Sequence, residues 1–202
     1  MKPSELYLDI TGRTGVYNIQ AIDNIPSIMK RGILSNEKAA AIEHISIAMN
    51  EIQNRRDGVF IPNGMPLHRY ANAYFDSRNP MLFKRKDEKE NLCILKIDRK
   101  ILDLDGVIVS DCNAASRYAG FYSPEIGLKE IDFRLVFATD WRDENLNEYY
   151  KKKSIKCAEI LVPYVIPYRF VTAVAVSSFE ASQKLEKIGF DKTIVVEPQQ
   201  FF

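Results

Sequence analysis

The sequence is poor in the residues that most often build metal sites and disulfides. Among its 202 residues there are two histidines, His44 and His68, and three scattered cysteines, Cys93, Cys112 and Cys157. Neither histidine stands at ligand spacing from a cysteine, so we expect no metal site. Three cysteines that lie far apart suit a reduced, cytoplasmic protein better than a disulfide-bonded one.

Long apolar runs are also absent. No segment approaches the roughly 20 apolar residues that a membrane helix needs, and the N-terminal stretch MKPSELYLDITGRTG has no apolar signal core. Charge is nearly balanced, since 28 Lys and Arg stand against 27 Asp and Glu, for a formal net charge of +1. We therefore expect a soluble protein without membrane contact, in which any site for a polyanion is a local patch.

The motifs of several common enzyme classes are missing. The chain has neither G-x-G-x-x-G nor G-x-x-x-x-G-K-[ST], the glycine loops that bind phosphates, and no G-x-S-x-G nucleophile elbow. A nucleotide would have to be bound in another way. No repeat, low-complexity tract or long linker divides the chain, so we expect a single domain over residues 1–202, acting as a monomer.

The first half of the chain carries mainly helical signals after a strand predicted around residues 15–19. The spacing predicts a helix over residues 25–32, with Pro26 in its first turn and Gly32 as its stop signal. A second helix is predicted over residues 44–56. Its apolar positions, at three- and four-residue spacing, are Ile45, Ala48, Met49 and Ile52.

Residues 57–86 show neither helical nor strand periodicity. This segment combines glycines and prolines with five aromatic residues. A long irregular stretch inside a domain is uncommon unless it binds something or is disordered, and the aromatic content argues against disorder. We therefore predict an ordered, functional loop.

The second half reads mainly as short strands. They are predicted over residues 91–98, 106–111, 134–140, 157–163, 171–178 and 192–198. One amphipathic helix interrupts them, with Phe179, Ala181, Leu185 and Ile188 on its apolar side. The pattern predicts an α+β fold with helices mainly in the N-terminal half and a mixed or antiparallel sheet, and it excludes a doubly wound βαβ fold.

Glu159 is out of place in the apolar strand KCAEILVP, where it shares one face with Cys157 and Leu161. Two interpretations fit this strand alone. The carboxylate either lies at a sheet edge or pairs with one of the many basic residues, or it serves a functional site, because unpaired charges are seldom buried.

Basic residues border the irregular segment. Arg55 and Arg56 end the helix before it, and a guanidinium offers a fork of donors that matches phosphate. The runs at residues 84–86 and 151–153 are solvated surfaces in most proteins, but the first adjoins aromatic residues on which nucleobases can stack.

The order of several segments is familiar: YNIQAIDNIPSIMKRGILS, SIAMNEIQNRR, IPNGMPLHRYANAYFDSRNPMLF and CAEILVP. Over residues 17–175 the sequence resembles the DarT family of DNA ADP-ribosyltransferase toxins. The most specific part is L-H-x-Y followed by Y-F-x-x-R-x-P-M. The resemblance implies an ADP-ribosyltransferase fold, in which a split α+β sheet grips NAD+, and transfer of ADP-ribose from NAD+ to a base in single-stranded DNA.

The same resemblance implies the residues of the site. Glu159 matches the catalytic glutamate and Arg56 the catalytic arginine. The residues expected to bind NAD+ are Arg56, Tyr17, Asn18, Ile19, Asn24, Gly64, His68, Tyr70, Tyr74 and Phe75. Those expected to bind DNA are Arg78, Asn79, Met81, Lys84, Arg85, Asn113, Arg117 and Tyr118, the last three in the loop 110–124 that meets the base.

The family pattern also implies an antitoxin that removes ADP-ribose from DNA. It does not decide which DNA base is modified. Thymine-modifying members have histidine where this chain has Asn18, and the YFDSRNPM segment looks more like the branch that modifies guanine, so guanine is favoured. Two alternatives remain: a transferase that acts on RNA or protein, and a non-catalytic module that binds nucleic acid and in which Glu159 is structural.

Overall fold

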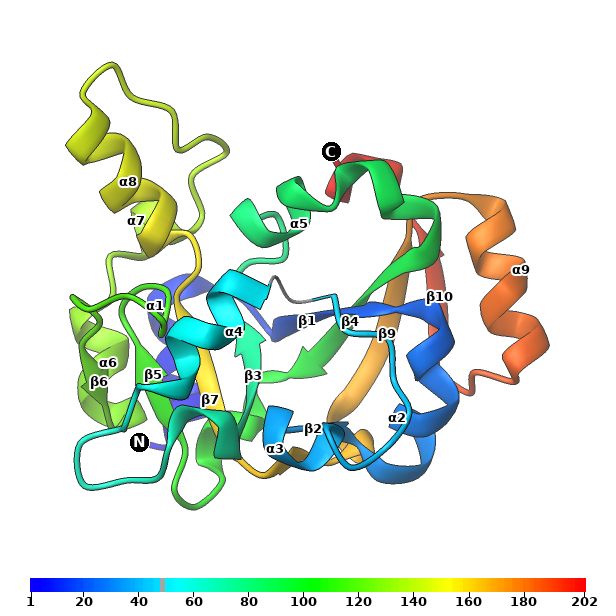
Figure 1. The fold of residues 1–202 in the computed structure, drawn as a ribbon, viewed down its shortest axis with the longest axis horizontal. Helices are drawn as coiled ribbons and strands as arrows, with labels where there is room; N and C mark the ends of the chain where they lie inside the picture. Colours follow the sequence, from blue (N-terminus) through cyan, green and yellow to red (C-terminus); the bar gives the residue numbers. More distant parts are fainter. Residues whose placement is uncertain (48–49) are drawn as a thin grey trace.

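The computed structural model describes residues 1–47 and 50–202, and a large mixed sheet forms its centre (Figure 1). Its strands are β1 (Gly15–Ala21), β3 (Tyr70–Tyr74), β4 (Leu92–Asp98), β5 (Ile108–Ser110), β6 (Phe121–Tyr122), β7 (Glu159–Pro163), β9 (Val171–Val176) and β10 (Thr193–Val196). Their order across the sheet is β10-β9-β4-β1-β3-β7-β5-β6. Neighbours are antiparallel except β9 and β10, which run parallel.

The sheet is split near its middle. β1 pairs with β4 along its whole length, and β3 pairs in the same way with β7. Between β1 and β3, by contrast, the register contains the single pair Tyr17 and Tyr74. The two half-sheets therefore diverge from this point, as the predicted split sheet requires. A separate two-stranded sheet pairs β2 (Ile33–Leu34) with β8 (Val165–Ile166).

Helices lie on both faces of the large sheet (Figure 1). The helices are α1 (Pro3–Thr11), α2 (Ile25–Arg31), α3 (Asn36–Ala39), α4 (Asn50–Asp57), α5 (Pro80–Lys84), α6 (Pro124–Glu130), α7 (Phe133–Val136), α8 (Leu146–Ile155) and α9 (Phe179–Ile188). The main core joins apolar residues of α1, α2, α6, α7 and α9 to the strands. Two smaller clusters occupy the opposite face, one around Tyr74 and Cys157 and one around Tyr70 and Leu161.

Local sequence signals explain α2 well. Pro26 stands in its first turn, where its missing N–H costs nothing, and Gly32 ends it with φ of 79°. A Cβ atom on Gly32 would lie 2.5 Å from the Ile166 carbonyl oxygen, so only glycine fits where the chain passes β8. The predictions of α2, β1 and α9 are confirmed, although Phe179 on α9 is 62% exposed and not part of the core.

The irregular segment contains a central strand that the sequence analysis misses. β3 lies within residues 57–86 and pairs with β7 on one side and β1 on the other. Its sequence YANAY is short and lacks β-branched residues, so its strand conformation depends on its neighbours in the sheet. The rest of the segment is ordered in turns and short helices, as predicted.

Two other element predictions are corrected. Residues 134–140 do not form a strand, because Asp132 accepts hydrogen bonds from the Arg134 and Leu135 N–H groups and starts α7 instead. The helix predicted over residues 44–56 begins only at Asn50. Residues 44–47 are not helical, and Ala48 and Met49, which contributed to the predicted periodicity, lie outside the described residues.

The α+β class is confirmed, although helices α6 to α9 extend through the second half, where mainly strands were expected. Within residues 1–47 and 50–202, no helix combines the length and the apolar character needed to cross a membrane.

Candidate active site

Glu159 is the first residue of β7, inside the sheet and not at its edge. It lies in register with Tyr74 of β3 on one side and with Ser110 of β5 on the other. The side chain is 1% exposed, so its charge needs partners. The structure therefore excludes the sheet-edge interpretation and supports the paired one.

The partners of Glu159 come from two segments far away in the sequence. Arg56 Nη1, at the end of α4, donates to Oε1 at 3.2 Å and to Oε2 at 3.1 Å. The Ala114 N–H, in the loop after β5, donates to Oε1 at 3.0 Å. The Ser110 hydroxyl accepts from the Glu159 N–H at 3.2 Å and fixes the backbone. A carboxylate has about four acceptor positions, so part of Oε2 is left for another donor.

Neutral side chains flank the carboxylate. Burial, with the Glu159 charge nearby, raises the pKa of the Cys157 thiol to about 12 and also raises the pKa of the Tyr74 hydroxyl. Both groups therefore stay protonated at neutral pH, which argues against a thiolate nucleophile at Cys157.

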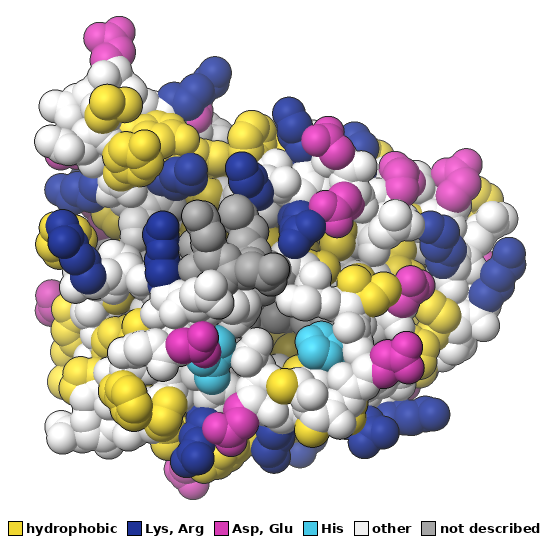
Figure 2. Space-filling model, in the orientation of Figure 1, with side chains coloured by type: hydrophobic (Ala, Val, Ile, Leu, Met, Phe, Trp, Pro, Cys, Tyr) yellow, Lys and Arg dark blue, Asp and Glu magenta, His cyan; other side chains and the backbone are white. Residues whose placement is uncertain are grey.

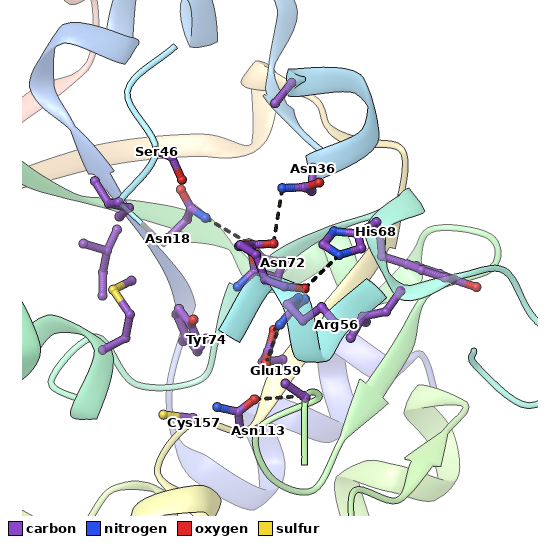
Figure 3. Close-up of a pocket in the computed structure, with 18 of the residues that line it drawn as sticks. Asn18, Asn36, Ser46, Arg56, His68, Asn72, Tyr74, Asn113, Cys157 and Glu159 are labelled. Atoms are coloured by element: carbon purple, nitrogen blue, oxygen red, sulfur yellow. Dashed lines mark hydrogen bonds and ion pairs between the residues drawn. The ribbon is translucent and has the colours of Figure 1, made fainter. Parts of the chain in front are cut away.

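A cleft of about 1010 Å³ opens above Glu159, on the face of the sheet opposite the main core (Figure 3). It is lined by β1 and β3, which belong to the two half-sheets, and by α4, α5, α8 and the loop 111–120. Of the predicted NAD+ and DNA residues, the cleft lining contains Asn18, Ile19, Asn24, Arg56, His68, Tyr70, Tyr74, Met81, Lys84, Arg85, Asn113, Arg117 and Tyr118, together with Glu159. Most of the predicted site therefore comes together in one place.

A chain of amides holds one wall of the cleft. Asn18 Nδ2 donates to the Asn72 carbonyl at 2.9 Å across the split between β1 and β3, and Gln20 Nε2 donates to Asn18 Oδ1 at 2.8 Å. Asn24 then binds Ile45 twice: Nδ2 donates to its carbonyl at 2.8 Å, and Oδ1 accepts from its N–H at 2.9 Å. Asn24 thus fixes the rim segment before α4, and Asn18 holds the two half-sheets together.

His68 stands at the opposite wall, in the short helix η2 (Leu67–Arg69). Its Nε2 lies 2.9 Å from Asp57 Oδ1 and 3.3 Å from the Gln53 carbonyl. Its Nδ1 is buried and has no hydrogen-bond partner among the described residues. A buried ring nitrogen without a partner is uncommon in folded proteins.

Five predicted residues lie outside the cleft lining. Phe75 is corrected most clearly: it is fully buried in the main core against Tyr7 and Phe133, because adjacent strand residues point to opposite faces and Tyr74 takes the cleft side. Tyr17 packs against the cluster around Tyr74 but is not part of the cleft lining. Binding roles for these residues are not supported.

The remaining three have structural positions. Asn79 is fully buried and caps α5, where its Oδ1 accepts from the Met81 and Leu82 N–H groups at 3.0 and 3.1 Å. The Arg78 guanidinium carbon lies 4.3 Å from the centre of the Phe202 ring. The Gly64 N–H donates to the Ile61 carbonyl in a tight turn.

Other groups were not found from the sequence. The cleft also contains Asn72, Gln53 and Tyr150, and Ser110 and Ala114 bind Glu159 without any local signal. Lys156, three residues before Glu159, is buried and forms an ion pair with Asp76. Among the described residues, no three His, Cys, Asp or Glu side chains are grouped so that they could hold a metal ion.

Known proteins with similar folds share this architecture. A structure of Thermosipho africanus DarTG in complex with ADP-ribose superposes with a TM-score of 0.82 at 28% identity, over 94% of this chain and 51% of that one. A structure of Thermus sp. 2.9 DarT in complex with ADP-ribosylated ssDNA also gives 0.82, at 23% identity, over 94% and 96% of the two chains. The second likeness concerns the fold alone.

Comparison of sequences points to the same family as comparison of structures. A DNA ADP-ribosyl transferase-DNA ADP-ribosyl glycohydrolase fusion protein of Thermosipho africanus is 31% identical over 203 residues, and this chain spans about half its length (93% of this chain, 48% of the relative). A DNA ADP-ribosyl transferase of Thermus sp. is 27% identical over 186 residues, 87% of each chain. The family model described as "ssDNA thymidine ADP-ribosyltransferase, DarT" matches residues 17–202. The chain therefore belongs to the DarT family, as its resemblance to these toxins predicts.

Proposed function

We propose that this chain transfers ADP-ribose from NAD+ to a base in single-stranded DNA. One observation carries the proposal: in a chain of the DarT family, the Glu159 carboxylate lies at the bottom of a large cleft with an acceptor position to spare. The cleft volume of about 1010 Å³ is at the upper end of the range of roughly 300–1,000 Å³ typical of small-molecule sites, so a dinucleotide fits.

The carboxylate suits the cleavage step. When the bond between nicotinamide and ribose breaks, positive charge develops on the ribose, and a preorganised carboxylate stabilises it, as in glycoside hydrolysis. Glu159 is held by Arg56 and Ala114 and needs no rearrangement to supply that charge. Its free Oε2 position is available to accept from a ribose hydroxyl or to take the proton that the attacking base nitrogen loses.

Arg56 contributes in two ways. Through Nη1 it orients Glu159, and the contacts described for this guanidinium leave Nε and Nη2 available for a phosphate or for the base. Asn18, Asn24 and His68 line the cleft with polar groups suited to NAD+. Single-stranded DNA fits such a site better than duplex, because pairing hides the reacting atoms of a base.

The base is proposed as guanine or thymine. The guanine preference came from the segment YFDSRNPM, but Arg78 and Asn79 of this segment lie outside the cleft lining. The matched family description names thymidine. Both bases therefore belong in the test.

Residues 1–202 act in this proposal as one monomeric domain. Its proposed partner is an antitoxin that removes ADP-ribose from DNA, since the Thermosipho africanus relative is a fusion with a DNA ADP-ribosyl glycohydrolase.

The test is product analysis by mass spectrometry. The protein is incubated with NAD+ and matched single-stranded DNA, duplex DNA or RNA, with Glu159→Ala protein as the blank. We expect an added ADP-ribose on single-stranded DNA alone, and oligonucleotides that contain only guanine or only thymine as the modifiable base identify the acceptor. Label on RNA or protein alone, or equal label with the Glu159→Ala protein, would overturn the proposal.

A further inference from the structure

Helix α8 has an exposed face that combines aromatic and cationic side chains. Leu146 and Tyr150 are 69% and 62% exposed, and Tyr149 and Lys153 lie beside them at three- and four-residue spacing. The rings of Tyr149 and Tyr150 meet edge to face with 5.2 Å between centroids. Lys153 Nζ lies 5.4 Å from the centre of the Tyr149 ring. Contacts among Tyr149, Tyr150 and Lys153 therefore help to hold the side chains of this face in place.

This face borders the cleft that contains Glu159. Tyr150 and Lys153 line the cleft together with Ser154, at the end of α8. The Asn113 N–H donates to the Ser154 carbonyl at 2.9 Å, which ties the helix to the loop whose Ala114 N–H binds Glu159. The position of α8 is therefore fixed relative to the candidate active site.

Among the residues that the structure describes, Lys153 on this face has no acidic partner. Lys152 is paired with Asp143 at 2.5 Å, whereas Lys153 Nζ donates to the Tyr149 hydroxyl at 3.4 Å. A second cation and ring, Arg117 and Tyr118, line the same cleft. Figure 2 shows Lys and Arg side chains gathered between α8 and the centre of this face. The surface therefore suits a polyanion with flat apolar groups.

Single-stranded nucleic acid has this chemistry, because it offers a phosphate at each step and unpaired bases that stack on aromatic rings. We propose that Tyr150 and Lys153 form a subsite for the nucleotide next to the one that is modified. The neighbouring base stacks on the Tyr150 ring, and its phosphate pairs with the Lys153 ammonium. The inference rests on the proposed function, which makes single-stranded DNA the substrate.

The experiment measures binding and turnover separately. Affinity for a single-stranded oligonucleotide of about 12 nucleotides is measured by fluorescence anisotropy at several salt concentrations. Transfer is measured on this strand and on a strand of equal length in which the positions on both sides of the modifiable base are abasic. We expect Tyr150→Ala to weaken binding of the intact strand about 5- to 100-fold and to raise its KM with little change in kcat. The abasic strand, which lacks the neighbouring bases, is expected to show a smaller difference.

Three further variants isolate the contacts. Tyr150→Phe keeps the ring and should keep the affinity, while Lys153→Ala should lower the slope of log affinity against log salt by about 0.7. Lys151→Ala removes an equal charge from an exposed position of α8 outside the cleft lining and should stay within about twofold of the wild type.

The outcomes separate this inference from the proposed function. If the wild type transfers ADP-ribose to DNA and the Tyr150→Ala and Lys153→Ala proteins match it in affinity and salt slope, the subsite is refuted and the face is left to a protein partner. If the wild type binds single-stranded DNA without transfer and Tyr150→Ala weakens that binding, the subsite stands while the enzymatic proposal fails. A wild type that does not bind single-stranded DNA refutes the subsite.

Discussion

Two buried ion pairs lie on either side of the junction between α8 and β7, and they differ in how completely they are satisfied. Lys156 Nζ donates to Asp76 Oδ2 at 2.7 Å and to the carbonyls of Val136 and Ala138 at 2.8 and 2.7 Å. An ammonium has three donors, so nothing is left over. This pair joins α8 to the segment after β3 and to the segment after α7, and it is closed to ligands.

The ion pair of Arg56 and Glu159 also joins a buried cation to a buried carboxylate, but some of its hydrogen-bonding positions remain unused. Glu159 is as deeply buried as Lys156. Among contacts of residues 1–47 and 50–202, however, its carboxylate keeps an acceptor position and its guanidinium partner, Arg56, donates through Nη1 alone. The comparison shows that two equally buried charges can differ in the hydrogen-bonding capacity that they leave unused. This remaining capacity beside a cleft is our reason for proposing a functional role for Glu159 and a structural role for Lys156.

Replacing the incomplete pair should have the largest effect on activity. Glu159→Gln keeps the size of the side chain but removes its charge, so transition-state stabilisation is lost and transfer should fall at least about 100-fold. Its melting temperature should fall by only a few degrees, because the cleft gives Arg56 access to water. Transfer rates and thermal unfolding of the same preparation check this, and retained activity would contradict the assignment of Glu159.

Breaking the ion pair of Lys156 and Asp76 should lower stability strongly and activity little. Lys156→Met leaves Asp76 without its partner and two carbonyls without a donor, so the free energy of unfolding should fall by about 3–5 kcal/mol. Activity per folded molecule should remain close to that of the wild type. Urea unfolding measures the loss, with the exposed Lys151→Met as the matched control. A stable Lys156→Met protein without activity would reverse the comparison.

The residue between the two pairs gives a smaller, pH-dependent effect. The pKa of Cys157 is raised to about 12 in the folded protein, first by burial, whereas an unfolded thiol has a pKa of about 8.5. The unfolded chain therefore loses this proton first, and the stabilisation present below about pH 8.5 declines as the pH rises towards 12. Between pH 8.5 and 10 the loss should reach about 2 kcal/mol.

Urea unfolding of wild-type and Cys157→Ala proteins at both pH values isolates this contribution. The free energy of unfolding should fall less in the variant, because the remaining alkaline loss comes from other groups, such as Cys112 with its pKa raised to about 11. Equal falls in the two proteins would show that the thiol titrates as freely as in the unfolded chain.

The sequence indicates those parts of the fold whose causes are local. Pro26 and Gly32 bound α2, and a carboxylate inside an apolar strand marks Glu159, since both signals lie within a few residues. β3 was missed because its conformation comes from pairing with β7 and β1. The strand predicted over residues 134–140 failed because one cap, Asp132, outweighs the apolar residues that follow it.

The site shows the same division between local and tertiary causes. The sequence places Arg56 at a helix end, but its contact with Glu159, 103 positions away, depends on the whole sheet. Ala114 contributes a backbone N–H, for which residue type gives no signal. Phe75 was assigned to the ligand because it belongs to an aromatic motif, although strand alternation alone places it on the side opposite Tyr74.

The distance in sequence between Arg56 and Glu159 also determines when the site can form during synthesis of the chain. The half-sheet that contains β1 and β4 is completed by β9 (Val171–Val176) and β10 (Thr193–Val196), so both the ion pair and the sheet around it require segments made late in synthesis. Such long-range pairings form only once the distant strands are available. The nascent chain thus cannot assemble the cleft until residue 159 has left the ribosome, and truncated translation products that end before it lack the carboxylate that we propose to be catalytic.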